Sequence, residues 1–151
     1  MKSFALAAAA VALTMSLSAA QAADDPVAAR KALMQSVATS AALSGGMMKG
    51  DIAYSPAAGR AAIVSLNAAA LSFGAFFPAG SGTAANTTAS PKIWDDAAGF
   101  SAALAKFSAA TGAAAQASGK DGPADVDAFK AAVGPVLASC KSCHEAYRVQ
   151  K

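Results

Sequence analysis

The chain has 151 residues, of which 55% are hydrophobic, 14% are charged and 7% are aromatic, and its formal net charge at pH 7 is +3. The charged fraction lies well below the roughly 25% of ordinary soluble domains, and so small a net charge does not favour a nucleic-acid partner. Much of the apolar content is alanine, the best helix former but a poor core filler. Composition therefore favours a helical protein over a β-sandwich and excludes a disordered chain.

The start of the chain has the pattern of a secretory signal peptide. A short positive start precedes an apolar run from Phe4 to Leu17, and residues 20–22 (Ala-Gln-Ala) supply the small-x-small pattern of a cleavage site. The run is shorter than the ~20 residues that span a membrane, and no later stretch is long and apolar enough to do so. We expect residues 1–22 to be removed and residues 23–151 to form one domain. The expected location is the periplasm, without stable membrane insertion.

The next two segments carry apolar residues at helical spacing and begin at proline-containing caps. One helix follows Asp25-Pro26 and extends to about Lys49, although a glycine pair at 45–46 weakens its last turns. The other opens at Ser55-Pro56 and stops at Pro78, where a loop rich in Gly, Ser, Thr and Asn begins. The expected inward-facing residues are Val27, Met34, Val37, Ala38 and Ala41 in the first helix and Ile63, Leu66, Ala70, Phe73 and Phe77 in the second.

Two further helical segments complete the domain. A helical region starts at Ser90-Pro91, and the last helix lies near the C-terminus, where Gly134-Pro135 is expected to bend or interrupt it. Their inward-facing residues are Phe100, Leu104, Phe107, Thr111 and Ala114, and then Val126, Phe129, Val133, Val136, Cys140, Cys143 and Tyr147. Four amphipathic helices predict an all-α fold, an antiparallel four-helix bundle.

The two cysteines and the only histidine fall within five residues, as Cys140-Lys-Ser-Cys143-His144. This is the attachment pattern of c-type haem. Two thiols at this spacing can form thioethers with the two vinyl groups of one haem, and His144 can bind the iron as its proximal ligand. On a helix the three side chains share one face. The motif therefore predicts one covalently attached haem c on the last helix.

Other uses of two cysteines fit the motif less well. A thioredoxin-like redox pair expects a βαβ context, which the sequence lacks. A zinc site needs a fourth ligand, and the chain has no further Cys or His. A disulfide between residues three apart on a helix is strained and leaves His144 unexplained.

Four stretches of the chain carry a resemblance to a known family: the ending Cys140-Lys-Ser-Cys143-His144-Glu-Ala-Tyr147-Arg148, Arg30-Lys-Ala-Leu-Met34, Lys49-Gly50 with nearby Tyr54, and Ser90-Pro-Lys-Ile-Trp94 ahead of Phe100. With them the sequence resembles the class II c-type cytochromes, the group of cytochromes c′ and c-556. The likeness covers essentially the whole mature chain, with its high alanine content and Ile52-Ala53 as departures. The resemblance implies a four-helix bundle with the haem on its last helix, and either a monomer or a homodimer packed through the first two helices.

In that family the position held here by Met34 faces the distal side of the haem. A methionine that binds the iron gives a six-coordinate, low-spin haem of the c-556 type, which suits electron transfer. A residue that does not bind leaves the iron five-coordinate and high-spin, as in most cytochromes c′, which suits NO or CO. We expect Met34 to be the distal ligand and the protein to be an electron carrier. The alternatives are a gas-binding cytochrome c′ with Met34 lining an open pocket, and Met34 as a core filler.

Three further residues are candidates for cofactor contacts: Arg30, Trp94 and Arg148. Arg148 follows His144 by one helical turn, so it can approach the haem or a propionate, or it can remain a solvated cation that favours the helix C-terminus. Trp94, like Tyr54, borders the haem or packs in the core, and packing is the simpler expectation.

The expected partners are haem and periplasmic redox proteins, with a homodimer as a further expectation. Lys141 and Lys151 could contribute to a docking patch, although a solvated surface explains them as well. We expect no enzymatic activity, because no nucleophile–base pair can be assembled once His144 is assigned to iron.

Overall fold

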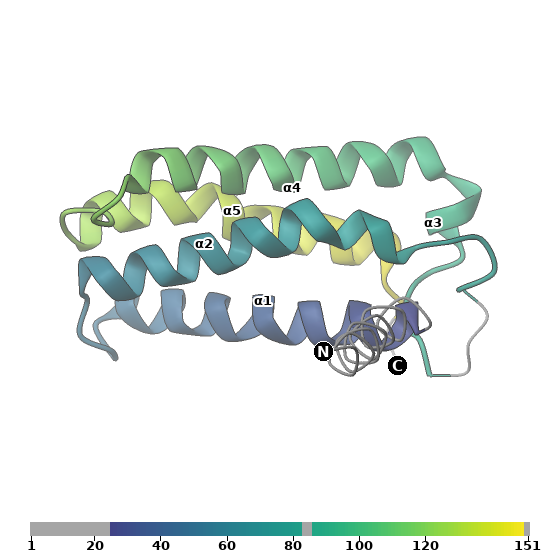
Figure 1. The fold of residues 1–151 in the computed structure, drawn as a ribbon, viewed down its shortest axis with the longest axis horizontal. Coiled ribbons are helices and arrows are strands. Elements are labelled where there is room, and N and C mark those ends of the chain that lie inside the picture. The colour runs from purple at the N-terminus through teal and green to yellow at the C-terminus, as the bar shows by residue number, and fades with distance from the viewer. Residues whose placement is uncertain (1–24, 83–85, 150–151) are drawn as a thin grey trace, which may run out of the picture.

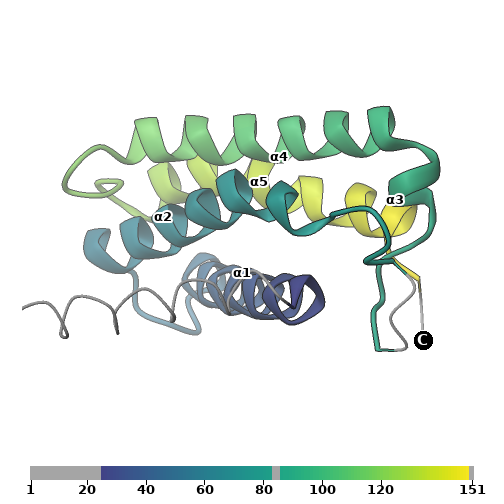
Figure 2. The same ribbon diagram turned by 45° about the vertical axis from the view of Figure 1, so that its right-hand side comes forward.

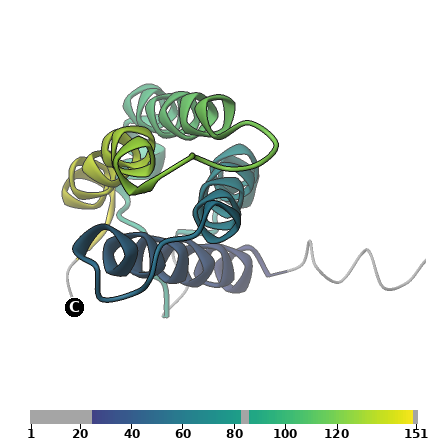
Figure 3. The same cartoon turned by 90° about the vertical axis from the view of Figure 1, so that its left-hand side faces the viewer.

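A computed structural model describes residues 25–82 and 86–149, so the expected signal peptide lies outside the described residues. The long helices are α1 (Pro26–Lys49), α2 (Pro56–Ser72), α4 (Ala97–Ser118) and α5 (Val126–Tyr147), joined by the 3-10 turn η2 (Phe73–Phe76) and the single-turn helix α3 (Lys92–Asp95). The long helices alternate in direction and surround a common axis (Figures 1 and 3). The expected all-α four-helix bundle is therefore confirmed.

Each long helix begins at a side-chain cap, and the sequence pattern predicts two of these caps, at Asp25 and Ser55. The helical region expected from Ser90-Pro91 is divided at Asp96 into α3 and α4. Asp25, Ser55, Asp96 and Asp125 each accept a hydrogen bond from a backbone N–H of the first turn, which satisfies a donor that the helix leaves unpaired. At the other end of α1, Gly50 adopts a left-handed conformation (φ 82°) that ends the helix. The glycine pair in the last turns of α1 remains helical.

Two expectations about α2 need correction. Its α-helix ends at Ser72 rather than at Phe77, and the tighter turn η2 follows. In addition, the unit Pro56–Phe76 is long and apolar enough, by length and composition, to span a membrane, with 33% of its 18-residue apolar window buried in the bundle. A core helix of a bundle has the same composition, and α2 packs against both α1 and α4.

Of the bend or interruption expected at Gly134-Pro135, the interruption is wrong, since α5 continues through both residues. Proline lacks an N–H, so the helix loses the hydrogen bond to the carbonyl of Ala131. Both Pro135 and Ala131 are exposed, and water can therefore satisfy that carbonyl.

The interior has two parts. One cluster fills the end of the bundle near the α1–α2 and α4–α5 connections and consists of Val37, Met47, Ile63, Leu66, Ala69, Ala114, Phe129, Val133 and Val136. A smaller cluster around Ile93, Phe100 and Tyr147 lies at the opposite end. There the connection from η2 to α3 passes the C-terminal end of α5 (Figure 2).

Candidate functional site

A cavity of about 780 Å³ opens between α1 and α5 near the smaller cluster. This volume lies in the range of small-molecule and cofactor sites. Most of the wall is apolar or aromatic. The lining residues are Val27, Arg30, Lys31, Met34, Gln35, Val37, Ala38, Ala41, Phe73, Phe77, Thr87, Thr88, Ala89, Ile93, Phe100, Ala103, Leu104, Phe107, Ser139, Cys140, Cys143, His144, Tyr147 and Arg148.

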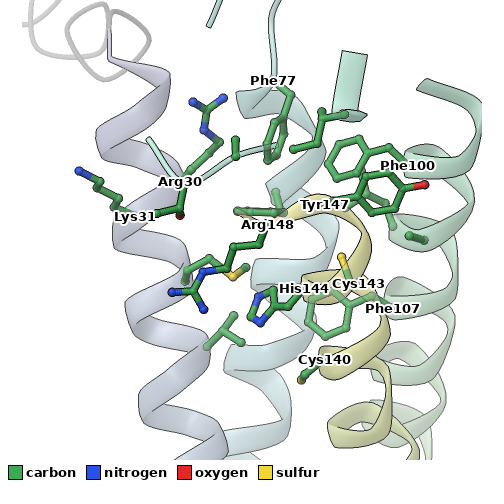
Figure 4. A pocket seen from close by; sticks show the side chains of 18 of the residues that line it. Arg30, Lys31, Phe77, Phe100, Phe107, Cys140, Cys143, His144, Tyr147 and Arg148 are labelled. Carbon is green, nitrogen blue, oxygen red and sulfur yellow. The ribbon is translucent and has the colours of Figure 1, made fainter. Parts of the chain in front are cut away.

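The α5 wall of the cavity carries the complete Cys-x-x-Cys-His motif. Cys140, Cys143 and His144 all line it, from one stretch of helix, as the three- and four-residue spacings require. Both thiols are free and half-buried, and Cys140 Sγ donates a long hydrogen bond to the carbonyl of Val136 (3.7 Å). Figure 4 shows His144 projecting from α5 toward α1.

The surroundings set the protonation of these three groups. Burial raises the pKa of Cys140, with a smaller opposing effect from its backbone hydrogen bond. Burial also raises the pKa of Cys143, and the neighbouring Cys140 adds to the shift. The pKa of His144 is lowered by burial and then by the positive charge of Arg148. At neutral pH the imidazole is therefore uncharged, the form in which histidine binds a metal ion.

The α1 wall faces this motif and carries Met34. Its side chain is half-buried and lines the cavity, and it also packs against the larger core cluster. Phe107 and Leu104 of α4 form part of the neighbouring wall. The structure thus brings a thioether and an imidazole to the same cavity from two different helices.

Three cations line the cavity, and no acidic side chain does so among the described residues. Arg30 is only 5% exposed, whereas Lys31 and Arg148 are exposed at the mouth. Burial lowers the pKa of Arg30, against a smaller raising effect from Asp25. Figure 4 shows Arg148 extending from the end of α5 across the cavity toward α1. A site with this charge favours a ligand that carries carboxylates.

Not every candidate residue reaches the cavity wall. The Trp94 ring stands behind Phe77, with the two ring centroids 6.2 Å apart, and its Nε1–H donates to the carbonyl of Pro78 (3.3 Å). Tyr54 lies at the other end of the bundle, where its hydroxyl donates to the carbonyl of Pro123. Packing accounts for both rings.

The sequence did not point to two features of the site. One is the wall formed by Thr87, Thr88 and Ala89, which belong to a connection that the sequence predicts only as a loop. The other is the hydrogen bond from the Tyr147 hydroxyl to Asp96 Oδ2 (3.1 Å), which joins the end of α5 to the start of α4. Loop composition carries no periodic signal, and Tyr147 and Asp96 are 51 residues apart in the sequence, so neither feature could be found from local spacing.

Comparisons with known proteins agree with this geometry. A family model described as "Cytochrome C'" matches residues 25–148. A cytochrome c′ of Rhodopseudomonas palustris (strain ATCC BAA-98 / CGA009) is 35% identical over 127 residues, which cover 84% of each chain. A cytochrome c-556 of the same strain is 32% identical over 141 residues, or 91% of each chain. The solved structure of cytochrome c′ from Rhodopseudomonas palustris superposes with a TM-score of 0.74 at 35% identity, covering 84% of this chain and 98% of that one.

Proposed function

This chain belongs to the cytochrome c′ family of class II c-type cytochromes, and from that premise we propose that it is an exported electron carrier with one covalently attached haem c. One observation carries the proposal: Cys140, Cys143 and His144 stand together on the wall of a large, mainly apolar cavity. Haem supplies an iron that takes up and releases one electron. No catalytic residue is needed for this function.

The residues of the cavity fit haem in size, polarity and charge. The two free thiols are the groups that form thioethers, and the neutral imidazole of His144 is the proximal ligand. The cations Arg30 and Arg148 suit the propionates, and the aromatic walls suit the ring. Trp94 supports the wall through Phe77 without lining the cavity.

We further propose that Met34 is the distal ligand, which makes the haem six-coordinate and low-spin, as in the c-556 type. Its position on α1, in the lining of the cavity that also holds the α5 motif, supports this role. The second candidate is a five-coordinate cytochrome c′ that binds NO or CO. The apolar side chains that line the same cavity as Met34, such as Val37 and Leu104, favour that candidate if the thioether does not bind.

Optical and EPR spectra of the purified holoprotein test the two candidates. We expect a low-spin spectrum that becomes high-spin in Met34→Ala. Met48→Ala is the matched control, because Met48 lies on the same helix and packs in the core but does not line the cavity. A high-spin native spectrum, with ready CO binding and no change in Met34→Ala, contradicts ligation by Met34. A pyridine haemochrome assay without a c-type spectrum contradicts the haem itself.

Export rests on the N-terminal pattern. We propose that residues 1–22 are cleaved and that the mature protein resides in the periplasm. The family match begins at residue 25, just beyond the proposed cleavage site. Intact mass and N-terminal sequencing of protein from a periplasmic fraction test this. A first residue other than Ala23, or protein that remains in the membrane fraction, contradicts it.

We propose that the protein forms a homodimer through α1 and α2, because a long stretch of each of these helices is uncharged and partly apolar. Residues 32–48 and 61–91 contain no charged side chain. On α2, Val64 and Leu71 are 44% and 72% exposed. An uncharged apolar face of this kind is typical of an interface. Sedimentation of the holoprotein should give a dimer, and Val64→Lys with Leu71→Lys should give a monomer. The matched pair Ala105→Lys with Ala109→Lys, on exposed positions of α4, should remain dimeric.

We also propose an acidic redox partner that docks beside the cavity mouth, where Lys31 and Arg148 are exposed. Because exposed charges are screened by salt, electron exchange with such a partner should slow as ionic strength rises. Exchange that accelerates with salt contradicts a cationic docking surface.

A further inference from the structure

The connection between η2 and α3 is fastened to two helices on opposite sides of the cavity. We call its described residues, 76–82 and 86–90, the rim segment. At one end Arg30 of α1 binds it. At the other end it pairs with the end of α5, where Ser90 N donates to the Tyr147 carbonyl (3.0 Å) and Val149 N donates to the Thr88 carbonyl (2.9 Å). Since Thr87, Thr88 and Ala89 line the cavity, these anchors determine where that wall stands.

All four hydrogen bonds of the Arg30 guanidinium go to the rim segment. Nη1 donates to the Phe76 carbonyl and to Ser81 Oγ, both at 3.0 Å. Nη2 donates to the Ser81 carbonyl at 2.9 Å and to Thr87 Oγ1 at 3.4 Å. A guanidinium has five N–H donors in a rigid fork, and four of them are used here. This arrangement connects two parts of the rim segment to one point on α1.

Aromatic contacts support the same position. The Arg30 guanidinium lies over the Phe77 ring at 4.8 Å and near the Trp94 ring at 6.0 Å. Gly82 lies so close to Trp94 that an added Cβ would stand 2.5 Å from its ring. The rim segment therefore packs closely around the guanidinium and Trp94.

Arg30 forms no ion pair with any described residue, and Asp25 acts on its charge only as the smaller, more distant influence. Among the described residues the ion pairs join Lys130 to Asp127 and Lys141 to Glu145, and Arg30 takes part in neither. Carbonyl and hydroxyl oxygens of the rim segment solvate the buried cation instead. Burying a charge in this way is costly, so the arrangement calls for a role beyond stability.

We propose that Arg30 is a positioning residue that holds the rim segment against the edge of the haem and so limits access of water to it. The inference rests on the proposed function, since the cavity is the haem site only in that proposal. It differs from a simple charge contact with a propionate because it requires the forked geometry of the guanidinium and the polar groups of the rim segment.

Three variants of the holoprotein separate geometry from charge: Arg30→Lys, Arg30→Gln, and Ser81→Ala combined with Thr87→Val. The first keeps the charge and loses the fork. The third keeps Arg30 and removes two of its acceptors, together with two bonds inside the segment: from Ser81 Oγ to the Pro78 carbonyl (2.8 Å) and from Ala89 N to Thr87 Oγ1 (3.1 Å). We measure hydrogen exchange of the rim-segment amides and the reduction potential of the haem. All three variants should raise exchange in the rim segment by about tenfold or more, since charged hydrogen bonds are lost, and should lower the potential as water reaches the haem.

Two controls test specificity. Lys31→Gln removes the adjacent, exposed cation that also lines the cavity. Ser90→Ala removes a local hydrogen bond, from Lys92 N to Ser90 Oγ (3.3 Å), on the same segment but without contact to Arg30. Both should leave exchange at residues 76–82 unchanged.

The opposite pattern overturns the proposal. If Arg30 acts by charge alone, Arg30→Lys and the Ser81→Ala, Thr87→Val variant will match the native protein, and only Arg30→Gln will shift the potential. Arg30→Lys decides the matter even if Arg30→Gln does not fold, because it leaves the hydrogen bonds inside the rim segment intact. A c-type haemochrome spectrum is recorded for every sample first, so a failure of the haem proposal is distinguished from a failure of the role of Arg30.

Discussion

The two ends of the bundle are built from the same four helices but are filled differently. At the packed end, near the α1–α2 connection, Phe129 and Val133 are fully buried and Met47 and Ile63 are almost so. At the cavity end, rings such as Phe107 stand on the walls of an open space. An alanine-rich chain thus closes one end with a few medium and large side chains and keeps the other end open for a flat apolar group.

Small residues explain where the space lies. Ala62, Ala69 and Ala70 of α2 and Ala114 of α4 are buried, which allows close approach of the helices that carry them. Among the adjacent pairs of long helices, α1 and α5 have the least contact. The cavity opens between these two helices, and they carry the candidate iron ligands Met34 and His144.

Removing the haem should have the largest effect on stability, because it takes away the group that fills the cavity end. The packed end should be unaffected. We expect a Cys140→Ala, Cys143→Ala variant, purified without haem, to lose more than about 4 kcal/mol of its free energy of unfolding. A ligand present at about 1,000 times its Kd contributes this much, and a covalently attached group cannot dissociate. Urea unfolding gives the total, and hydrogen exchange should show the loss at residues 136–147 and not around Phe129. Equal stability with and without haem contradicts the comparison.

A large-to-small change at the packed end should come next. Phe129→Ala removes a fully buried ring, which costs about 3 kcal/mol in well-packed cores. Phe107→Ala is the matched change on the cavity wall, where the ring is half-buried, and in the haem-free protein it should cost about half as much. Urea unfolding of both variants measures the difference. Equal losses would mean that the cavity end is packed as tightly as the other.

A tyrosine hydroxyl fastens each end, and each can be removed without changing the ring. Tyr54→Phe leaves the buried carbonyl of Pro123 without its donor and should cost about 1 kcal/mol with or without haem. Tyr147→Phe removes the bond to Asp96 at the cavity end, so its cost should be larger in the holoprotein, where that end is ordered. Thermal unfolding of both forms checks this. A cost of Tyr54→Phe that depends on haem contradicts the independence of the two ends.

The smallest effects should come from the surface of α5, where each end has one exposed ion pair. Lys130→Ala breaks the pair with Asp127 and Lys141→Ala the pair with Glu145, at 3.4 and 3.6 Å. Exposed pairs contribute about 0.5 kcal/mol or less, so both variants should unfold with nearly the same free energy as the native protein. Urea unfolding measures both variants. A loss above about 1 kcal/mol in either one would mean that surface charges, and not only interior packing, contribute to the difference in stability between the two ends.

Local patterns were enough for the helices and for the haem motif. Caps such as Asp25 and Ser55 mark helix starts, and Cys140, Cys143 and His144 lie on one face because their spacing is helical. These features depend on residues that are near one another in sequence, so periodicity predicts them.

Long-range contacts could not be predicted in this way. The partners of Arg30 lie 46 to 57 residues further along the chain, and no local pattern indicates them. The continuous course of α5 past Pro135 likewise depends on solvent reaching the exposed carbonyl of Ala131. The motif that contains Trp94 predicts either a neighbour of the haem or a packed ring, and only the three-dimensional structure shows that Phe77 stands between Trp94 and the cavity.

The position of Trp94 also gives the molecule a built-in optical probe. It is the only tryptophan in the chain, and it stands one ring behind the cavity wall. A coloured group in the cavity absorbs energy from a nearby indole, so the intrinsic fluorescence of the protein should be weak with haem and bright without it. Binding of the cofactor, its loss, and local unfolding of the cavity end can therefore be followed in real time, without a label, through the fluorescence of one native side chain.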